Sequence, residues 1–591
     1  MCFFGVVVFL LISSECLGSK PADQKQVQQQ NTITTTKFES ANKSCPPWRY
    51  DKYQNSSCVC GDTIHDIVRC EKDQSTVSLL TCHCMSYSDH NDIVLVGGCP
   101  YLCTDAFYTT IFDRTNISGL CNRDIQQNRQ GQMCGKCLDN FAPSPYTYSL
   151  ECAECSNYKY NWIKYLLIAY LPLTVFFLVV IIFRFNAMSA SMNSFIFFSQ
   201  IFSCSAAMSI FSVFVSFSVK NKTDDPDVNL MFSAKVLSTI YGIWNLDFFR
   251  MIYEPFCLHP NMSIFQVMSL DYAIAVYPLF LICLTYLVIK LHDKFNIVQL
   301  LWKPAAWLFT RFSHQWRVSN SLIEAFGTFI LLSYVKIINT SFDILIPVQL
   351  YNVSGKVVGL YTYYNGSLEY FGQDHLPYAV LAIFMFFTFN LVPLLLFCLY
   401  PCRCFRSCLN CCRLNSQVLR TFMDAFQGCY KFEPYDCRYW AAFYLFLRIV
   451  ILAIFALTQS GYLLLVTGIL IIPVVSLLAV VRPYRQTVYN VVDIVMFLTF
   501  IQMCFSAVGF SLSAFDRRYE SFVSVMFGIA LMFLPTYAIV LAVKNIIPNR
   551  WIAIIKKHVL RALCRKNEQL LTVSEDAADP LLQEVADSTE A

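Results

Sequence analysis

The densest group of chemically reactive side chains in this 591-residue chain lies at residues 401–413, PCRCFRSCLNCCR. Five cysteines stand there among three arginines, directly after a long apolar run. Thiols at this density form disulfides, bind a metal or carry lipid, and the choice depends on whether they face an oxidising or a reducing compartment. The chemistry of this stretch therefore depends on the topology of the whole chain.

The N-terminal stretch CFFGVVVFLLI is apolar but too short to cross a membrane. The small residues that follow it predict a cleaved secretory signal at 1–18, with a retained anchor as the alternative. Residues 19–44 are rich in Gln, Thr and Lys without apolar periodicity, which predicts a flexible stalk. The segment that follows, 45–155, would then lie in an oxidising compartment.

Residues 45–155 are polar and rich in cysteine. Cys134, Cys137, Cys152 and Cys155 have the C-x2-C-x14-C-x2-C spacing of a zinc ribbon, which would predict a metal site inside a cell. After a secretory signal we instead expect disulfides and no metal, and the stretch MCGKCLDNFAPSPYTYSLECAEC resembles the terminal loops of EGF and laminin-type modules. The disulfide candidates are Cys45, Cys58, Cys60, Cys70, Cys82, Cys84, Cys99, Cys103, Cys121, Cys134, Cys137, Cys152, Cys155 and, from a later loop, Cys257.

The rest of the chain is dominated by apolar blocks of about 20 residues, the length of a membrane-spanning helix. The predicted fold is an all-α polytopic membrane protein with a small disulfide-rich N-terminal ectodomain, its membrane domain covering 160–545. Nine spans are expected, at 162–184, 194–219, 268–290, 320–342, 378–400, 438–458, 461–481, 487–511 and 521–544.

A tenth apolar segment, 229–249, is interrupted by Lys235 and Asp247. It would lie on the outer surface or dip into the membrane and return, an arrangement tolerated where the backbone is buried in protein or lines water. The alternative is a tenth crossing with an eleventh near NIVQLLWKPAAWLF.

The orientation of the spans follows from charge and from sequons. With the ectodomain outside, the inner loops and tail carry 21 Lys and Arg against seven in the outer loops, which is the positive-inside bias. Every N-x-[ST] sequon then lies outside, although Asn339 is close to a helix end. The glycosylation candidates are Asn42, Asn55, Asn116, Asn221, Asn261, Asn352 and Asn365. Cys257 is the one cysteine in an outer loop, and it would give the 13 ectodomain cysteines an even number.

Charged side chains inside the predicted spans are costly, at about 2.5–3.5 kcal/mol each at a helix centre. Arg448 in the sixth span and Asp493 in the eighth lie at depths of about 15 and 9 Å from the inner ends, which makes them a candidate pair. Glu324 and Lys336 lie in the fourth span. These groups would form a polar path through the bundle, or Arg448 and Asp493 would only join two helices while Glu324 and Lys336 reach the interfaces.

Motifs of enzymes and cofactors are absent from the sequence. It contains no HExxH, GxSxG or Walker A sequence and no GxGxxG that enters a helix. Asp271 and Asp493 are predicted at opposite faces of the membrane, which argues against a diaspartyl protease. We therefore expect no enzymatic activity, no cofactor and no nucleic-acid partner.

The predicted topology places residues 401–437 in the reducing cytosol. Read as a helix, Cys404, Cys408 and Cys411 share one face, with arginines nearby to meet anionic lipid headgroups. Acylation, plain reduced thiols and a four-thiolate metal site all remain open. The lipidation candidates are Cys402, Cys404, Cys408, Cys411 and Cys412.

The C-terminal part of the chain changes from basic to acidic. Residues 546–567 predict a basic amphipathic helix at the inner membrane surface, with a calmodulin-type target as the alternative. Residues 568–591 carry acids without Lys or Arg and predict a disordered cytosolic tail.

Several stretches carry a resemblance to a known group. GIWNLDFFR, PCRCFRSCLNCCR, CRYWAAFYLFLRI and VRPYRQTVYNVVD resemble uncharacterised multi-pass surface proteins with cysteine-rich or EGF-like ectodomains. In layout the chain is also similar to TRP-like channels of the flavin-carrier type. The first resemblance implies an architecture, and the second implies a channel.

These features predict a plasma-membrane protein with an extracellular N-terminus and a cytosolic C-terminus. Its expected role is that of a receptor or channel-like protein that couples the ectodomain to the membrane domain, with an extracellular protein or glycan as ligand. The alternatives are a TRP-like ion channel proper and an adhesion or structural protein without transport activity.

The predicted orientation can be tested by glycosylation. Asn261→Gln and Asn352→Gln are each expected to remove one N-linked glycan, because both sequons lie in predicted outer loops. The measurement is gel mobility before and after glycosidase treatment. If Asn352 carried no glycan, the predicted orientation of half of the spans would have to be reversed.

Overall fold

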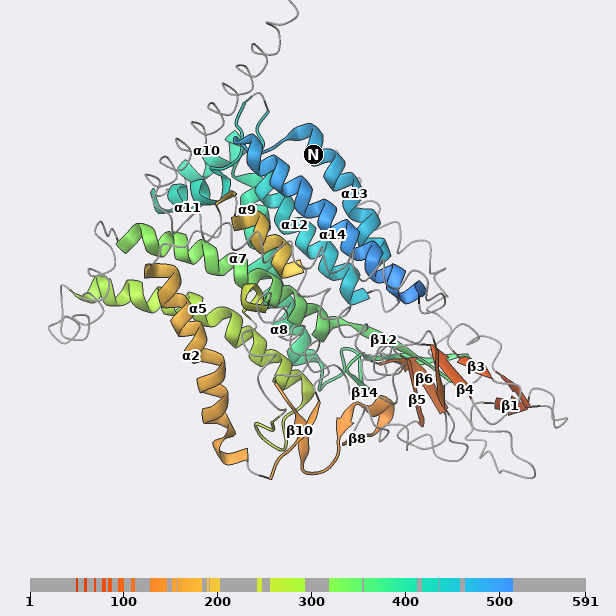
Figure 1. Cartoon of the computed structure of the whole chain (residues 1–591). Coiled ribbons are helices and arrows are strands. Elements are labelled where there is room, and N and C mark those ends of the chain that lie inside the picture. Colours follow the sequence, from red (N-terminus) through yellow and green to blue (C-terminus); the bar gives the residue numbers. More distant parts are fainter. Residues whose placement is uncertain are drawn as a thin grey trace, which may run out of the picture.

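The fold is taken from a computed structural model, in which the described residues are drawn as coloured ribbon in Figure 1. The described residues are 49–51, 58–60, 68–70, 77–80, 83–87, 94–99, 108–111, 128–145, 151–156, 158–182, 189–190, 192–201, 242–246, 256–292, 318–352, 355–411, 417–433, 435–457 and 463–513.

Strands dominate the early part of the chain and helices dominate the later part. The strands are β1 (Arg49–Asp51), β2 (Cys58–Cys60), β3 (Val68–Cys70), β4 (Val77–Leu80), β5 (His83–Tyr87), β6 (Val94–Gly98), β7 (Tyr108–Ile111), β8 (Arg129–Gln130), β9 (Lys136–Cys137), β10 (Phe141–Pro143), β11 (Cys152–Glu154), β12 (Pro347–Asn352), β13 (Val357–Thr362) and β14 (Asn365–Glu369). The α-helices are α2 (Asn161–Ile182), α5 (Ile264–His292), α7 (Val318–Leu345), α8 (Leu376–Phe386), α9 (Val392–Leu399), α10 (Arg403–Cys411), α11 (Gln417–Gln427), α12 (Tyr439–Leu457), α13 (Leu463–Val481) and α14 (Thr487–Ser513). Short helical turns are η4 (Gln132–Cys134), η5 (Tyr158–Tyr160), η6 (Ile243–Asn245) and the π-helical η7 (Phe387–Leu391), and residues 192–201 are also helical.

Six helical segments are long and apolar enough to cross a membrane. They are Tyr158–Ile182, Ile264–Ile289, Leu322–Leu345, Leu376–Leu399, Tyr439–Leu457 and Thr487–Phe505, and each overlaps a predicted span. A shorter apolar helix, Leu465–Val481, lies within the predicted span 461–481. The protein is therefore a mostly helical membrane protein. Of the other two predicted spans, 194–219 is described only up to residue 201 and 521–544 lies outside the described residues, so the count of nine stays a prediction.

The fourth of these segments changes its helical period in the middle. It runs as α8, then one π-helical turn, η7, and then α9. Asn390 within η7 is buried and its Nδ2 donates to the carbonyl oxygen of Tyr334 on α7, 2.9 Å away. A π-helical turn inside an α-helix marks a local departure from the regular ladder, here fastened to a neighbouring helix.

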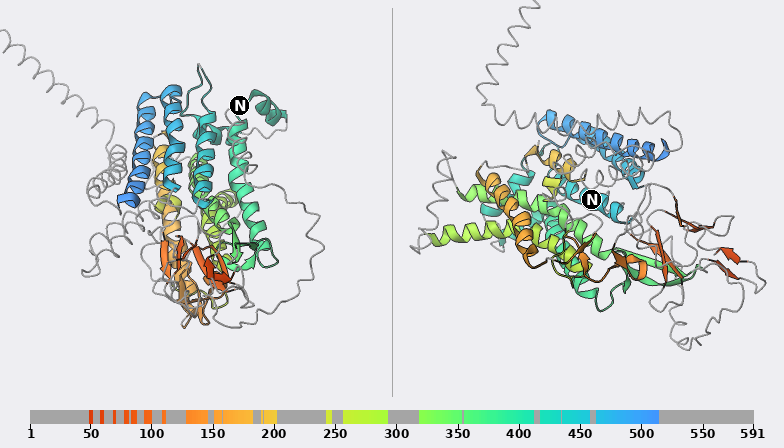
Figure 2. Two further views of the ribbon diagram at one scale, coloured as in Figure 1. Left: turned by 90° about the vertical axis from the view of Figure 1, so that its right-hand side faces the viewer. Right: turned by 60° about the horizontal axis from the view of Figure 1, so that its bottom comes forward.

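Different elements lie at the two ends of the helical bundle. The strands gather at the end where α2 and α5 begin and α7 ends, whereas α10 and α11 lie at the opposite end (Figures 1 and 2). We call these the sheet end and the far end.

A five-stranded antiparallel sheet contains strands from two parts of the chain that were predicted to belong to separate domains. Its order is β14-β13-β12-β6-β5, with Tyr351 opposite Val96 and Asn352 opposite Leu95. Strands β5 and β6 belong to residues 45–155, here called the disulfide-bearing region, whereas β12–β14 lie between α7 and α8. This corrects the expected all-α membrane domain, because the loop between two spans is itself β-structure that extends the disulfide-bearing region.

Local sequence explains why this loop forms strands. In β12 the side chains of Val348 and Leu350 are buried and that of Gln349 is exposed, the alternation of a half-buried strand. At the β12–β13 turn, Asn352 Oδ1 accepts from the backbone N–H of Lys356, and Gly355 has a φ of 75°. Asn and Gly are the residues that tolerate such a turn.

One hydrophobic cluster runs from the sheet into the helices. It contains buried residues of the disulfide-bearing region together with residues of α5, α7, β12 and α8, including Leu95, Met133, Phe265, Ile344, Leu350 and Met385. Two glycines allow the close approach: a Cβ at Gly135 would lie 2.5 Å from Asn365 Oδ1, and one at Gly366 would lie 2.6 Å from Met133 Cγ. The disulfide-bearing region is therefore packed onto the helix ends.

His375 fastens the sheet to two helices just before α8 begins. Its Nδ1 accepts from the backbone N–H of Phe371, 3.1 Å away, so Nε2 carries the hydrogen and donates to the carbonyl oxygen of Ile344, 3.0 Å away. The ring is fully buried and lies 5.3 Å from the ring of Tyr370. Burial lowers the pKa of His375 below its usual range, while the bond to Ile344 acts in the opposite direction.

Protonation of His375 is expected to weaken this contact, because the added proton removes the acceptor that Phe371 uses. A folded-state pKa below the unfolded value of about 6.5 means that the stabilisation is complete above that pH and is lost as the pH falls below it, by at most about 1.4 kcal/mol per pH unit. Thermal unfolding from pH 8 to 5 should therefore show a steeper loss of Tm in the wild type than in His375→Gln. Equal slopes would contradict this, and His259→Gln, which removes an exposed histidine at the same end, is the control.

Candidate functional site

Polar side chains buried in the helical bundle form the candidate site. Arg448 and Asp493 are both 0% exposed. Complete burial is rare for ionisable side chains, because removing a charge from water costs free energy. They come from α12 and α14, and the polar residues around them come from the helix at 192–201 and the loop before α14. We call Ser194, Gln200, Tyr444, Arg448, Tyr484 and Asp493 the core polar cluster.

The carboxylate of Asp493 is surrounded by hydroxyl groups. Its Oδ1 accepts from the Ser194 hydroxyl and its Oδ2 from the Tyr444 hydroxyl, and Tyr484 is a third hydrogen-bonding partner. Hydroxyl donors can replace the hydration that a buried carboxylate loses. Asp493 is therefore satisfied by neutral donors.

The guanidinium of Arg448 has a different set of partners. Its Nε donates to Gln200 Oε1, 3.0 Å away, and its Nη1 donates to the carbonyl oxygen of Tyr444, 3.2 Å away. Its Cζ lies 4.7 Å from the ring centre of Phe197, a cation–π contact. Among the described residues Nη2 has no hydrogen-bond partner.

The expected direct pair between Arg448 and Asp493 is not formed in the described residues. Tyr444 instead contacts both, with its hydroxyl on Asp493 and its carbonyl oxygen on Arg448. Tyr444 and Arg448 are four residues apart on α12 and so lie on the same side of that helix. The depths of the two residues along their helices correctly suggested that they lie in one cluster. Within it, Tyr444 is hydrogen-bonded to both side chains and links them.

Gln200 connects this cluster to the rest of the bundle. Its Nε2 donates to the carbonyl oxygens of Trp244, at 3.0 Å, and Leu331 on α7, at 3.1 Å. Its own carbonyl oxygen accepts from Asn245 Nδ2 at 3.1 Å. Through one residue the helix at 192–201, η6, α7 and α12 are joined.

The η6 turn belongs to the predicted re-entrant segment 229–249. Residues 242–246 are described, and Trp244 also packs edge-on against Phe195 at 5.3 Å. Lys235 and Asp247 lie outside the described residues. The described part of this segment is thus one short helical turn that is hydrogen-bonded to Gln200 of the bundle, and backbone buried in protein in this way is tolerated within a membrane.

Lys336 and Glu324 were expected to reach the interfaces or to join a polar path. Lys336 is buried on α7, where its Nζ lies 2.8 Å from Asp271 Oδ1 on α5. Glu324, near the far end of α7, is half-buried.

The core polar cluster reaches the far end through two stacked tyrosines. Tyr430 and Tyr484 form an isolated antiparallel bridge with ring centres 5.0 Å apart. Asn193 Nδ2 donates to the Tyr430 hydroxyl at 3.4 Å. Burial raises the pKa of both phenols well above the usual value, so they stay neutral.

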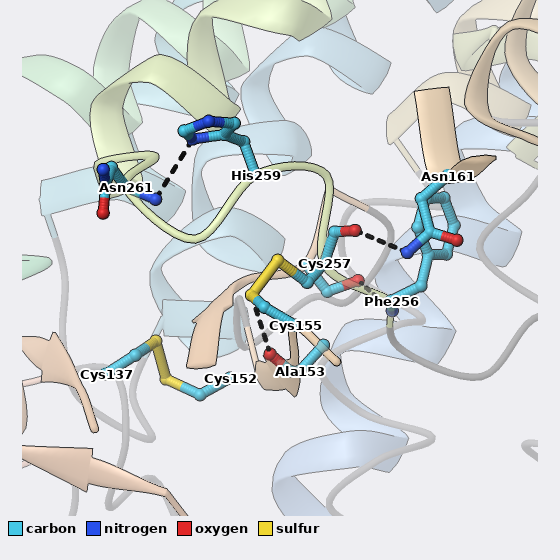
Figure 3. Close-up of a disulfide and its surroundings, with 10 residues drawn as sticks. Cys137, Cys152, Ala153, Cys155, Asn161, Phe256, Cys257, His259 and Asn261 are labelled. Carbon is cyan, nitrogen blue, oxygen red and sulfur yellow. Dashed lines mark hydrogen bonds between the residues drawn. A yellow bond between two sulfur atoms is a disulfide. The ribbon is translucent and has the colours of Figure 1, made fainter. Parts of the chain in front are cut away.

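Seven cysteines at the sheet end are disulfide-bonded. Cys84 bonds to Cys99, Cys137 to Cys152 and Cys155 to Cys257, and Figure 3 shows the last two side by side. Cys134 is also disulfide-bonded, so the four thiols with zinc-ribbon spacing are all used in disulfides. Asn161 Nδ2 donates to the carbonyl oxygen of Cys257 at 2.6 Å, which fastens the link to the start of α2 (Figure 3). Cys58, Cys60 and Cys70 lie in β2 and β3, and Cys45, Cys82, Cys103 and Cys121 lie outside the described residues.

The sequons that the structure describes at the sheet end differ in accessibility. Asn261 is exposed, Asn352 is half-buried, and Asn365 is 9% exposed with its Oδ1 accepting from the Ser367 hydroxyl. Asn339 lies within α7. Asn42, Asn55, Asn116 and Asn221 lie outside the described residues.

Cys402, Cys404, Cys408 and Cys411 lie on or next to α10 at the far end (Figure 1). Cys404 is free and exposed, and Cys402 is free and half-buried. Cys408 and Cys411 lie in the helix, and Cys412 lies outside the described residues.

Comparisons of the chain with protein-family models, with curated proteins and with solved structures find no match.

Several residues of the core polar cluster were not among the sequence candidates. Ser194, Gln200, Tyr444 and Tyr484 were passed over because uncharged polar residues are common in membrane helices. The spacing of Tyr444 and Arg448 was a usable signal, since residues four apart on a helix are neighbours.

The bridging role of Tyr444 predicts a measurable coupling. Tyr444→Phe and Asp493→Asn should destabilise the protein non-additively, with a coupling of about 0.5–3 kcal/mol, because Tyr444→Phe removes the donor and Asp493→Asn removes the acceptor's charge in the same hydrogen bond. The measurement is a double-mutant cycle on the free energy of unfolding in mixed micelles. Tyr272→Phe, which removes a hydroxyl contact to Ser341 in the other hydrophobic cluster, should be additive with Asp493→Asn. Additivity in both cycles would disprove the bridge.

Proposed function

We propose that this protein is a multi-pass cell-surface receptor in which an extracellular disulfide-bearing region controls the packing of the membrane helices. The observation that carries the proposal is the shared sheet. Strand β12 follows α7 directly and pairs with β6, so a displacement of the disulfide-bearing region acts on a membrane helix without a flexible connection.

A route from the sheet to the core polar cluster runs along α7. One residue separates Leu345, the last residue of α7, from the start of β12. The carbonyl oxygen of Leu331, about 21 Å earlier along the helix, accepts from Gln200. Gln200 in turn holds Arg448. A rigid helix that contacts a fully bonded amide is the kind of element through which coupling can travel.

The orientation of the receptor follows the predicted topology. The sheet end carries the described disulfides and the sequon residues Asn261, Asn352 and Asn365, which supports an extracellular sheet end in an oxidising compartment. The far end, with α10 and its arginines, would then be cytosolic, and the membrane would be the plasma membrane. An extracellular protein or glycan is the proposed ligand.

Three of the four stretches that carry the resemblance to cysteine-rich multi-pass surface proteins contribute to the core polar cluster or bond to it. GIWNLDFFR supplies Trp244 and Asn245, CRYWAAFYLFLRI supplies Tyr444 and Arg448, and VRPYRQTVYNVVD supplies Asp493 along with Tyr484. This supports the cluster as the functional centre that such proteins would share.

The coupling can be tested by hydrogen–deuterium exchange of the full chain in lipid nanodiscs. The probe is an antibody fragment raised against the folded disulfide-bearing region. Its binding should change exchange in α7 and α12 as well as at its epitope. A change confined to residues 45–155 would overturn the receptor proposal in favour of an adhesion or structural protein.

A matched pair of glycine variants sharpens this test. Gly366→Ala should reduce the change in α7 at least two-fold, because its Cβ would meet Met133 across the junction. Gly359→Ala, whose Cβ would meet only Tyr361 within the same sheet, should leave the change intact. Equal responses from the two variants would count against transmission through the sheet.

A TRP-like ion channel is the second candidate function, favoured by two fully buried ionisable residues inside the bundle. Single-channel conductance of the purified protein in planar bilayers, abolished by Arg448→Ala and Asp493→Ala at unchanged expression, would support it. The absence of conductance would exclude it.

A further inference from the structure

Helix α10 lies where a membrane span ends at the far end of the bundle (Figure 1). The apolar segment Leu376–Leu399 stops four residues before α10 begins at Arg403. Val392, Leu395 and Leu399 are exposed on α9, a stripe of one helix face suited to lipid. Leu409 of α10 packs against the main hydrophobic cluster, so α10 is held beside the bundle at the level where α9 leaves the membrane.

The free thiols of the far end outside the spans differ sharply in their surroundings. Cys402 is half-buried, with its Sγ 3.4 Å from the Tyr439 hydroxyl. Burial raises the pKa of the Cys429 thiol to about 12 and also raises the pKa of the buried Cys437. Among the cysteines of this end that lie outside the spans and whose side chains the structure describes, Cys404 alone is both free and exposed.

The helix presents Cys404 together with other cysteines and with cations. Cys404, Cys408 and Cys411 fall at positions i, i+4 and i+7 of α10 and share one face by helical period. Arg403 is exposed, and Arg406 donates from Nη2 to the carbonyl oxygen of Pro401 at 3.1 Å. Cations at this level suit anionic headgroups. With only nine residues, α10 is also too short to be stable in water by itself.

We propose that Cys404 is S-acylated by a long-chain fatty acyl-CoA, and that the acyl chain enters the bilayer beside Leu395 and Leu399 of α9. The thiolate sulfur forms a bond to the acyl carbonyl carbon, the bond between that carbon and the CoA sulfur breaks, and the cysteine proton passes to the CoA thiolate. Nothing is oxidised or reduced. The acyl chain and the adjacent arginines would together hold α10 against the membrane surface. The proposal rests on the cytosolic position of the far end proposed above.

The test is hydroxylamine-dependent acyl exchange on the full-length protein from cultured cells. Thioesters are cleaved by hydroxylamine, and the released thiols are labelled with a maleimide of known mass. Cys404→Ser should lose at least one mass increment, whereas Cys402→Ser, the matched control, should keep the wild-type pattern. A wild-type protein without increments, or a Cys404→Ser variant with the wild-type number, would overturn the proposal.

The same samples separate this failure from a wrong orientation. Glycosidase treatment reports whether Asn261 at the sheet end carries a glycan. A glycosylated protein without acyl increments would refute acylation while leaving the proposed orientation intact. A protein with neither would refute both.

Discussion

The pairing of β6 with β12 is the interaction on which the rest of the structure depends. Two hydrogen-bonded positions, Tyr351 with Val96 and Asn352 with Leu95, connect strands about 250 residues apart in the chain. Because β12 follows α7 and precedes α8 in the chain, the segment that joins these two apolar helices supplies the central strand of this sheet. The disulfide-bearing region therefore cannot complete its largest sheet alone, and its hydrophobic core continues into α5, α7 and α8.

The bundle accommodates a buried cation and a buried anion without placing them in contact. A direct ion pair in a medium of low polarity gains Coulomb energy but still loses the hydration of both ions. Here three hydroxyl groups solvate Asp493, and an amide, a carbonyl oxygen and an aromatic ring solvate Arg448. Each charge is thus stabilised by polar groups from different elements. The free energy of burying each charge therefore depends on how those elements are oriented.

The sequence was informative where a property is local and less so where it depends on partners. Apolar length alone located the six helices that are long and apolar enough to span a membrane, because a membrane selects for length and composition. Parity suggested a role for Cys257, which bonds to Cys155 in the structure. Depth along the helices predicted that Arg448 and Asp493 lie near each other. Depth does not specify the direction of a side chain around the helix axis, and so the bridging role of Tyr444 was missed. The alternation in β12 was visible in the sequence, yet nothing near it identifies β6 as its partner.

The π-helical turn η7 determines more than the path of one span. Each residue added to or removed from a helix rotates everything beyond it by about 100° about the axis. The extra width of η7 therefore sets the rotational position of α9 relative to α8, and with it the direction in which the chain leaves the membrane towards α10. A one-residue deletion that restored regular α-helix would break the Asn390 contact to α7 and turn Leu395 and Leu399 towards a different side of the bundle. The rotational position of the far-end cysteine helix is thus encoded some fifteen residues upstream, at a point where no cysteine is present.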